Sequence, residues 1–194
     1  MRIMTTVFIM LCLAGCMDND NYTPKRRGYF RITLPDKQYV KYYAECPFTF
    51  EYPGYAQVIR DTEPSAEPCW LNIYFPRFKA NINFTYKVVN NNLTQYIAES
   101  QEFVTHHEVK ASGINEQAVS NLKEHVFGNI YDIEGNAASN MQFYLTDSSK
   151  NFIRGALYFY SVPNKDSIEP VLKFVKEDVY HLVQSLRWKN DTAK

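Results

Sequence analysis

The sequence predicts an α+β fold in which an antiparallel β-sheet is flanked by helices. Several segments alternate apolar and polar residues, which is typical of half-buried strands. Two other segments repeat apolar residues every three or four positions, which is typical of amphipathic helices. Short stretches rich in Gly, Asn, Asp and Ser separate the last strand-like segments, so we expect hairpins and therefore antiparallel neighbours.

The chain begins like a bacterial lipoprotein precursor. Arg2 supplies a positive charge, and the mostly apolar run 4–13 is too short to cross a bilayer but suits a signal peptide. The motif Leu13-Ala14-Gly15-Cys16 then has small residues followed by a cysteine, the pattern of lipoprotein cleavage and lipidation sites. We expect residues 1–15 to be removed and Cys16 to carry the lipid anchor. An ordinary signal peptide with an incidental cysteine, or a short buried helix, is the alternative.

Composition predicts the boundaries of the remaining chain. Residues 16–27 are polar and end in three consecutive basic residues, so we expect a lipidated, flexible tether. Its acidic part also resembles the surface-export signals of Bacteroidetes lipoproteins, but a solvated linker is the simpler interpretation. A single α+β domain is predicted over 28–188, which is long enough for a substantial core, and 189–194 is predicted as a disordered tail.

The strands of the first half are predicted from alternation. Ala80, Ile82, Phe84 and Tyr86 share one face of their segment, whereas the residues between them are polar. One face of such a strand packs into the core and the other meets water. The strands expected here are 29–32, 48–52, 70–75 and 80–87.

The second half contains the two helices. Behind Asn92 as a cap, apolar residues recur at helical spacing and predict a helix over 92–107. An irregular stretch around Ala118 and Val119 is expected next. Asp166 and Glu169 form a start signal for a final amphipathic helix that runs to about Arg187. The strands expected between the two helices are 126–133, 140–146 and 152–160.

Charge and aromatic content restrict the function classes. Lys plus Arg and Asp plus Glu both total 21, so no net charge attracts nucleic acid, and we expect none as a partner. Aromatic residues are abundant, with 15 Tyr, 13 Phe and 2 Trp. They suit a Tyr-rich antiparallel sheet, and a face that binds sugar or peptide is the functional alternative.

Two cysteines remain besides Cys12 in the signal peptide and Cys16. Cys46 and Cys69 belong to an exported chain, whose compartment favours disulfides, so we expect them to pair. Two separately buried thiols are the alternative.

No catalytic or metal-binding motif stands out. His106 and His107 are adjacent on a helix and so point about 100° apart, which does not suit a shared metal. His106 suits a helix C-terminus instead. Ser139 and the other serines lack a nucleophile elbow. We expect no enzyme, metal or cofactor, and a hydrolase with an unrecognised carboxylate pair is a lesser alternative.

Long aromatic-rich blocks resemble one known family. They are the lipobox Leu13–Cys16, PKRRGYFRITLP at 24–35, CPFTFEYPGYA at 46–56, CWLNIYFPRFKANINFTYK at 69–87, and YDIEGNAASNMQFYLTDSSKNFIRGALYF at 131–159. In this order they are similar to the gliding-motility lipoprotein GldD family of the Bacteroidetes. The order of elements also resembles the PsbP/Mog1-type α/β/α sandwich.

The resemblance implies a non-enzymatic envelope protein needed for gliding motility and type IX secretion. Its implied partners are other lipoproteins and envelope proteins of that machinery, with the membrane reached through the lipid anchor on Cys16. We expect the outer membrane, facing the periplasm. A module that binds peptidoglycan or another glycan through exposed Tyr and Trp70 is the alternative.

Overall fold

The computed structural model describes residues 32–106, 110–160 and 165–189, and the side chains of 165–168 are not described. The expected signal peptide, Cys16, the tether and His107 therefore lie outside the described residues. No helix within the described ranges is both long and apolar enough to span a bilayer.

The centre of the molecule is a seven-stranded antiparallel sheet with the strand order β4-β5-β6-β10-β9-β8-β7. Its strands are β4 (Gln57–Arg60), β5 (Leu71–Phe75), β6 (Ala80–Val88), β7 (Ala111–Asn121), β8 (Val126–Gly135), β9 (Ser139–Thr146) and β10 (Asn151–Phe159). Two small antiparallel pairs join β1 (Tyr39–Lys41) to β3 (Glu51–Pro53) and β2 (Phe48–Thr49) to β11 (Arg187–Trp188). A single 3₁₀ turn, η1 (Pro76–Phe78), precedes β6.

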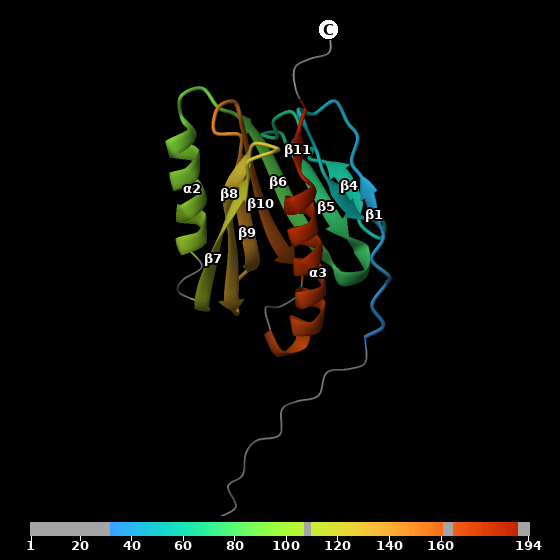
Figure 1. Cartoon of the computed structure of the whole chain (residues 1–194). Coiled ribbons are helices and arrows are strands. Elements are labelled where there is room, and N and C mark those ends of the chain that lie inside the picture. Colours follow the sequence, from blue (N-terminus) through green and yellow to red (C-terminus); the bar gives the residue numbers. More distant parts are fainter. Residues whose placement is uncertain (1–31, 107–109, 161–164, 190–194) are drawn as a thin grey trace, which may run out of the picture.

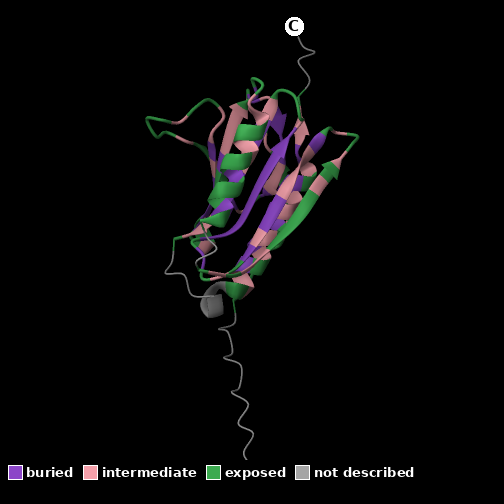
Figure 2. Cartoon of the chain, turned by 90° about the vertical axis from the view of Figure 1, so that its left-hand side faces the viewer, coloured by how far each residue is buried: buried purple, intermediate pink, exposed green. Residues whose placement is uncertain are grey.

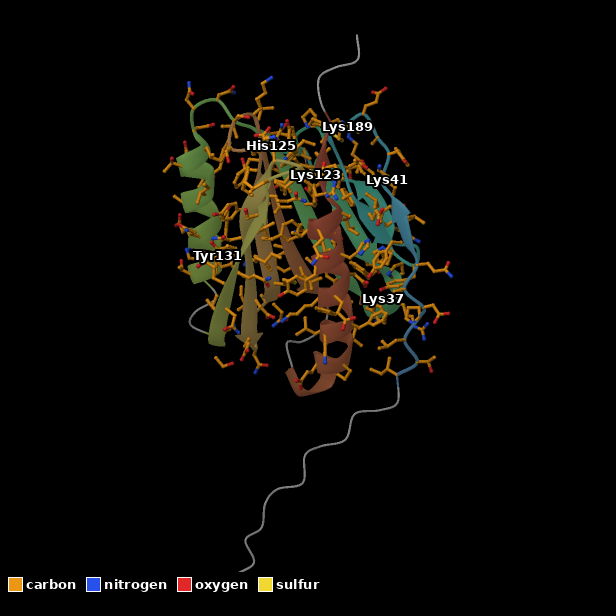
Figure 3. All side chains as sticks on the ribbon, viewed as in Figure 1. Lys37, Lys41, Lys123, His125, Tyr131 and Lys189 are labelled. Atoms are coloured by element: carbon orange, nitrogen blue, oxygen red, sulfur yellow. A yellow bond between two sulfur atoms is a disulfide. The ribbon has the colours of Figure 1, made fainter. Side chains whose placement is uncertain are left out.

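Two helices lie on opposite faces of the sheet (Figure 1). α3 (Lys165–Ser185) and the N-terminal strands cover the main core, and α2 (Leu93–Thr105) covers a smaller one. Tyr131 lies on the α2 side (Figure 3). Figure 2 shows α2 in front of the buried sheet. The predicted fold class, an antiparallel sheet flanked by helices, is confirmed.

Aromatic rings fill the main core. Phe48, Phe50 and Phe84 are buried, and the ring centroid of Phe84 lies 5.3 Å from that of Phe48 and from that of Phe50. The alternation that predicted a strand over 48–52 is thus real, but the chain divides there into β2 and β3. The two short strands pair with different partners, β11 and β1, so no single straight strand can serve both.

The structure differs from the sequence expectations at three places. The stretch around Ala118 and Val119 is the eleven-residue strand β7, paired with β8 along its length. Its sequence shows weak alternation because it lies at the sheet edge, where most of its side chains are exposed on both faces. Ile32, the one described residue of the strand predicted over 29–32, is not in a strand. The final helix begins at Lys165, so Asp166 lies inside it.

Candidate functional site

The sequence-predicted site residues are dispersed. Cys46 and Cys69 form a disulfide with their Cα atoms 5.7 Å apart, which links the chain just before β2 to the chain just before β5. The described residues include no group of three or more His, Cys, Asp or Glu side chains that could hold a metal ion. His106 caps α2, and its Nε2 lies 3.7 Å from Oε1 of Glu102.

A buried carboxylate on α3 holds the N-terminal segment. Asp178 is 1% exposed, and it accepts hydrogen bonds from the hydroxyls of Tyr39, at 2.9 Å, and Tyr55. Nζ of Lys37 lies 3.0 Å from Asp178 Oδ1 and donates to the Phe174 carbonyl at 2.8 Å. We call Lys37, Tyr39, Tyr55 and Asp178 the N-terminal clasp. Figure 3 shows Lys37 beside the lower half of α3.

Neighbouring groups extend the clasp. The ring of His181 stacks on Tyr39 with centroids 3.5 Å apart, and its Nε2 lies 2.7 Å from Oε2 of Glu51. Burial first, and then the hydrogen bond to Asp178, raise the pKa of both Tyr39 and Tyr55 far above that of an exposed tyrosine. Both hydroxyls therefore keep their protons at neutral pH and act as donors to the carboxylate.

Sequence reasoning missed the clasp, although a signal for it exists. Asp178 lies four residues after Phe174, three after Val175 and four before Leu182, on the apolar stripe of the last helix. A charged residue on a buried stripe requires partners. The chain supplies them from positions more than 120 residues away, and no local pattern could identify those.

A groove runs between α3 and the part of the sheet formed by β7 and β8. Two hollows of about 450 and 400 Å³ adjoin at Tyr180. We call their combined surface the edge groove, and its characteristic lining is Val119, Ile130, Asp132, Lys176, Tyr180 and Val183.

The two ends of the edge groove differ in charge. Val119, Ile130 and Val183 line one end together with the polar side chains of Gln117 and Gln184. At the other end Lys176 forms an ion pair with Asp132. Burial and the nearby Asp132 raise the pKa of Tyr180, so this tyrosine stays neutral where the two ends meet.

An aromatic pocket lies on the opposite side of the sheet, beside α2. Its volume is about 190 Å³, and Trp70, Tyr96, Phe103 and Phe152 line it together with Arg154. The guanidinium of Arg154 lies over the Phe103 ring at 4.3 Å and donates to Gln142 Oε1 at 2.6 Å. Its Nε is buried and has no hydrogen-bond partner within the described part of the chain.

A solved structure with low sequence identity shares the fold of this chain. The solution structure of cyanobacterial PsbP (CyanoP) from Synechocystis sp. PCC 6803 is similar to this chain with a TM-score of 0.51. The match covers 82% of this chain and 97% of that one at 11% sequence identity, which shows a shared fold alone. No curated protein matches the chain in sequence.

A family model gives the closer assignment. The model described as gliding motility lipoprotein GldD matches residues 19–188, which include every described strand and helix. The match thus extends over the clasp, the edge groove and the aromatic pocket, and it agrees with the lipoprotein motif at the N-terminus. On this evidence the chain belongs to the gliding motility lipoprotein GldD family.

Proposed function

We propose that this gliding motility lipoprotein is a non-enzymatic accessory component of the gliding and type IX secretion machinery and acts by binding other envelope proteins. The family match over residues 19–188 carries the proposal. The edge groove supports it, because a hollow that combines aliphatic side chains, polar side chains and an ion pair suits a polypeptide partner.

We further propose that a lipid on Cys16 holds the domain at the periplasmic face of the outer membrane. Residues 17–31 could extend over about 50 Å, so the anchor allows the domain to search a shell of that depth. The clasp supports this arrangement because it fastens the first described segment to α3. The segment that carries the lipid would then be held by residues packed in the core of the domain.

Deletion of the gene tests the proposal. A strain lacking the protein should fail to spread on agar and should retain type IX cargo, and re-expression of the full chain should restore both. Chemical crosslinking of intact envelopes, followed by purification of the lipoprotein, should recover other lipoproteins of the machinery. Normal spreading and normal secretion in the deletion strain would refute the proposal.

The aromatic pocket favours a second candidate function, binding of peptidoglycan or another glycan. Trp70 and Phe103 could stack on sugar rings, and the guanidinium of Arg154 lines the same pocket. The full lipoprotein in detergent should then co-sediment with purified peptidoglycan. Phe103→Ala should reduce the bound fraction severalfold, and the matched control Ile59→Ala, at another exposed apolar position, should not. Equal binding by both variants would exclude this pocket.

A further inference from the structure

We propose that β7 accepts an extended segment of a partner protein as an additional strand of the sheet, with side chains of that segment entering the edge groove. This inference rests on the proposed function as a protein-binding lipoprotein and names the recognition mode. Strand addition supplies affinity through main-chain hydrogen bonds and specificity through alternate side chains.

The outer edge of β7 is unpaired among the described residues. Among the described residues β7 pairs on one side only, with β8. Its eleven residues present an edge of about 37 Å. The outward N–H and C=O groups of such an edge form a template for another strand. Figure 2 shows this edge strand coloured mainly as exposed, to one side of α2.

β7 also lacks the features that usually protect an edge strand. Proteins commonly guard an edge with lysines, prolines, bulges or very short strands. β7 has one charged residue, Glu116, and no proline or lysine, and its only irregularity lies at its start, between Ala111 and Gly113. The opposite edge strand β4 has four residues, ends in Arg60 and offers a much shorter template.

The edge groove lies beside β7. Alternate side chains of an added strand point to the α3 side, where Val119 and Val183 are the aliphatic part of the hollow of about 450 Å³. Leu122 lines the same hollow just beyond the end of β7 and is 76% exposed. Aliphatic side chains of a partner would bury this surface.

The occupant is a segment of a different protein rather than a second copy. In a two-fold antiparallel pairing over the whole of β7, Glu116 is the midpoint and would face its own copy, and like charges directly opposite are destabilising. A lysine or arginine of a partner strand opposite Glu116 would instead be attracted.

Segments of this same chain fit less well. Residues 190–194 read Asn-Asp-Thr-Ala-Lys, which is polar and has no alternating aliphatic side chains for the groove. The N-terminal segment enters on the side of β1, away from β7 (Figure 1). There Arg77 of η1 donates to the Thr33 carbonyl. The ligand class is therefore an extended partner segment with alternating aliphatic residues and a basic residue near its centre.

Site-specific photocrosslinking in living cells tests the inference on the full lipoprotein. A photoreactive side chain is placed in turn at Asn115, Gln117 and Val119, and at the control position Gln57, which is also an exposed glutamine on an edge strand. We expect the three β7 positions to crosslink one partner segment. The crosslinked residue should shift along that segment by about two positions for each two-residue step, as strand pairing requires.

Variants that add lysines to β7 provide a second test of the inference. Gln117→Lys combined with Ala118→Lys should lower the crosslink yield from Asn115 at least tenfold, and the matched control Gln57→Lys should leave it unchanged. Equal unfolding midpoints of the two variants would show that the effect is not loss of folding. Crosslinks without an ordered register, crosslinks to a second copy or to residues 190–194, or an unchanged yield would each overturn the inference. None of these crosslinking results depends on motility. The proposed function is tested separately, by spreading and secretion in the deletion strain.

Discussion

Asp178 shows how one residue can determine the way a tether meets a domain. A buried carboxylate is tolerated only when its oxygens are paired, and here two tyrosine hydroxyls and one ammonium group pair them. All three partners precede β4, whereas Asp178 lies in the last helix. The interaction thus joins the two ends of the described chain.

Replacement of Asp178 by alanine should destabilise the domain strongly. The change leaves the hydroxyls of Tyr39 and Tyr55 partly buried without their acceptor and removes one of the partners of Lys37, which we expect to cost about 3–5 kcal/mol. Urea unfolding of the full lipoprotein in detergent measures this loss. Glu177→Ala is the control, because Glu177 also contacts Lys37 but is 56% exposed, and its loss should cost less than about 1 kcal/mol. Similar losses in the two variants would refute the role of burial.

Asp147 should make the domain sensitive to acid. Burial alone would raise the pKa of this carboxyl, but backbone hydrogen bonds from Asn151, Lys150 and Ser149 outweigh burial and hold the pKa below its usual value. The stability from this depressed pKa is fully present above about pH 4, the usual aspartate value, and is lost as the pH falls through the folded-state pKa.

The measurement is the urea midpoint as a function of pH. Wild type should lose more stability than Asp147→Asn between pH 5 and about pH 2, because the amide cannot titrate. Parallel pH profiles for the two proteins would show that Asp147 does not contribute.

At the scale of elements, Gly155 allows two aromatic rings to meet over the central strands. It pairs with Phe84 on one side and Phe143 on the other, and the two ring centroids lie 6.3 Å apart. A Cβ at this position would lie 2.1 Å from Cζ of Phe143. The strand therefore has no room for any side chain here.

Gly155→Ala should destabilise the sheet by about 1–3 kcal/mol, since the Phe143 ring must move from its packed position. Gly54→Ala is the matched control, because a Cβ there would meet its nearest atom at an ordinary 3.5 Å. Thermal unfolding followed by near-UV circular dichroism reports both stability and the packing of the rings. An unchanged Gly155→Ala spectrum and midpoint would contradict this account.

The disulfide should stabilise the first half of the fold. Cys46 and Cys69 are 23 positions apart, and closing a loop of that size is expected to contribute about 3 kcal/mol. The double variant Cys46→Ser, Cys69→Ser should lose this amount in urea unfolding. Thiol titration of the unreduced, denatured protein should detect no thiol from either cysteine, and two reactive thiols would disprove the bond.

Strand and helix prediction succeeded where packing produces a period. The segments 70–75 and 80–87 each have one face in the main core, so burial selects apolar residues at every second position. The segments 126–133 and 140–146 are predicted from the turn residues between them, and 140–146 is buried along its whole length. β7 lacks such a face over most of its length, and its sequence therefore resembles a loop. The weak alternation of β7 made this strand hard to predict. It has the same cause as the exposure of the edge to which we propose that a partner strand is added.

At the scale of the whole molecule, Cys16→Ser should release the protein from the membrane. Without the thiol no lipid can be attached, so the precursor should stay uncleaved or become soluble. Carbonate extraction of envelopes and intact mass measurement distinguish these forms from the mature lipoprotein. A variant with unchanged extraction and unchanged processing would show that Cys16 is not the anchor.

The sequence by itself determined the α+β class, both helices and most of the central strands, because periodic burial leaves a local record. Its aromatic blocks and lipobox also indicated the family that the comparison confirmed. Only the tertiary structure decided the clasp on Asp178, the space over Gly155 and the groove beside β7. Each of these depends on residues far apart in the chain that meet only after folding, and such meetings leave no local pattern in the sequence.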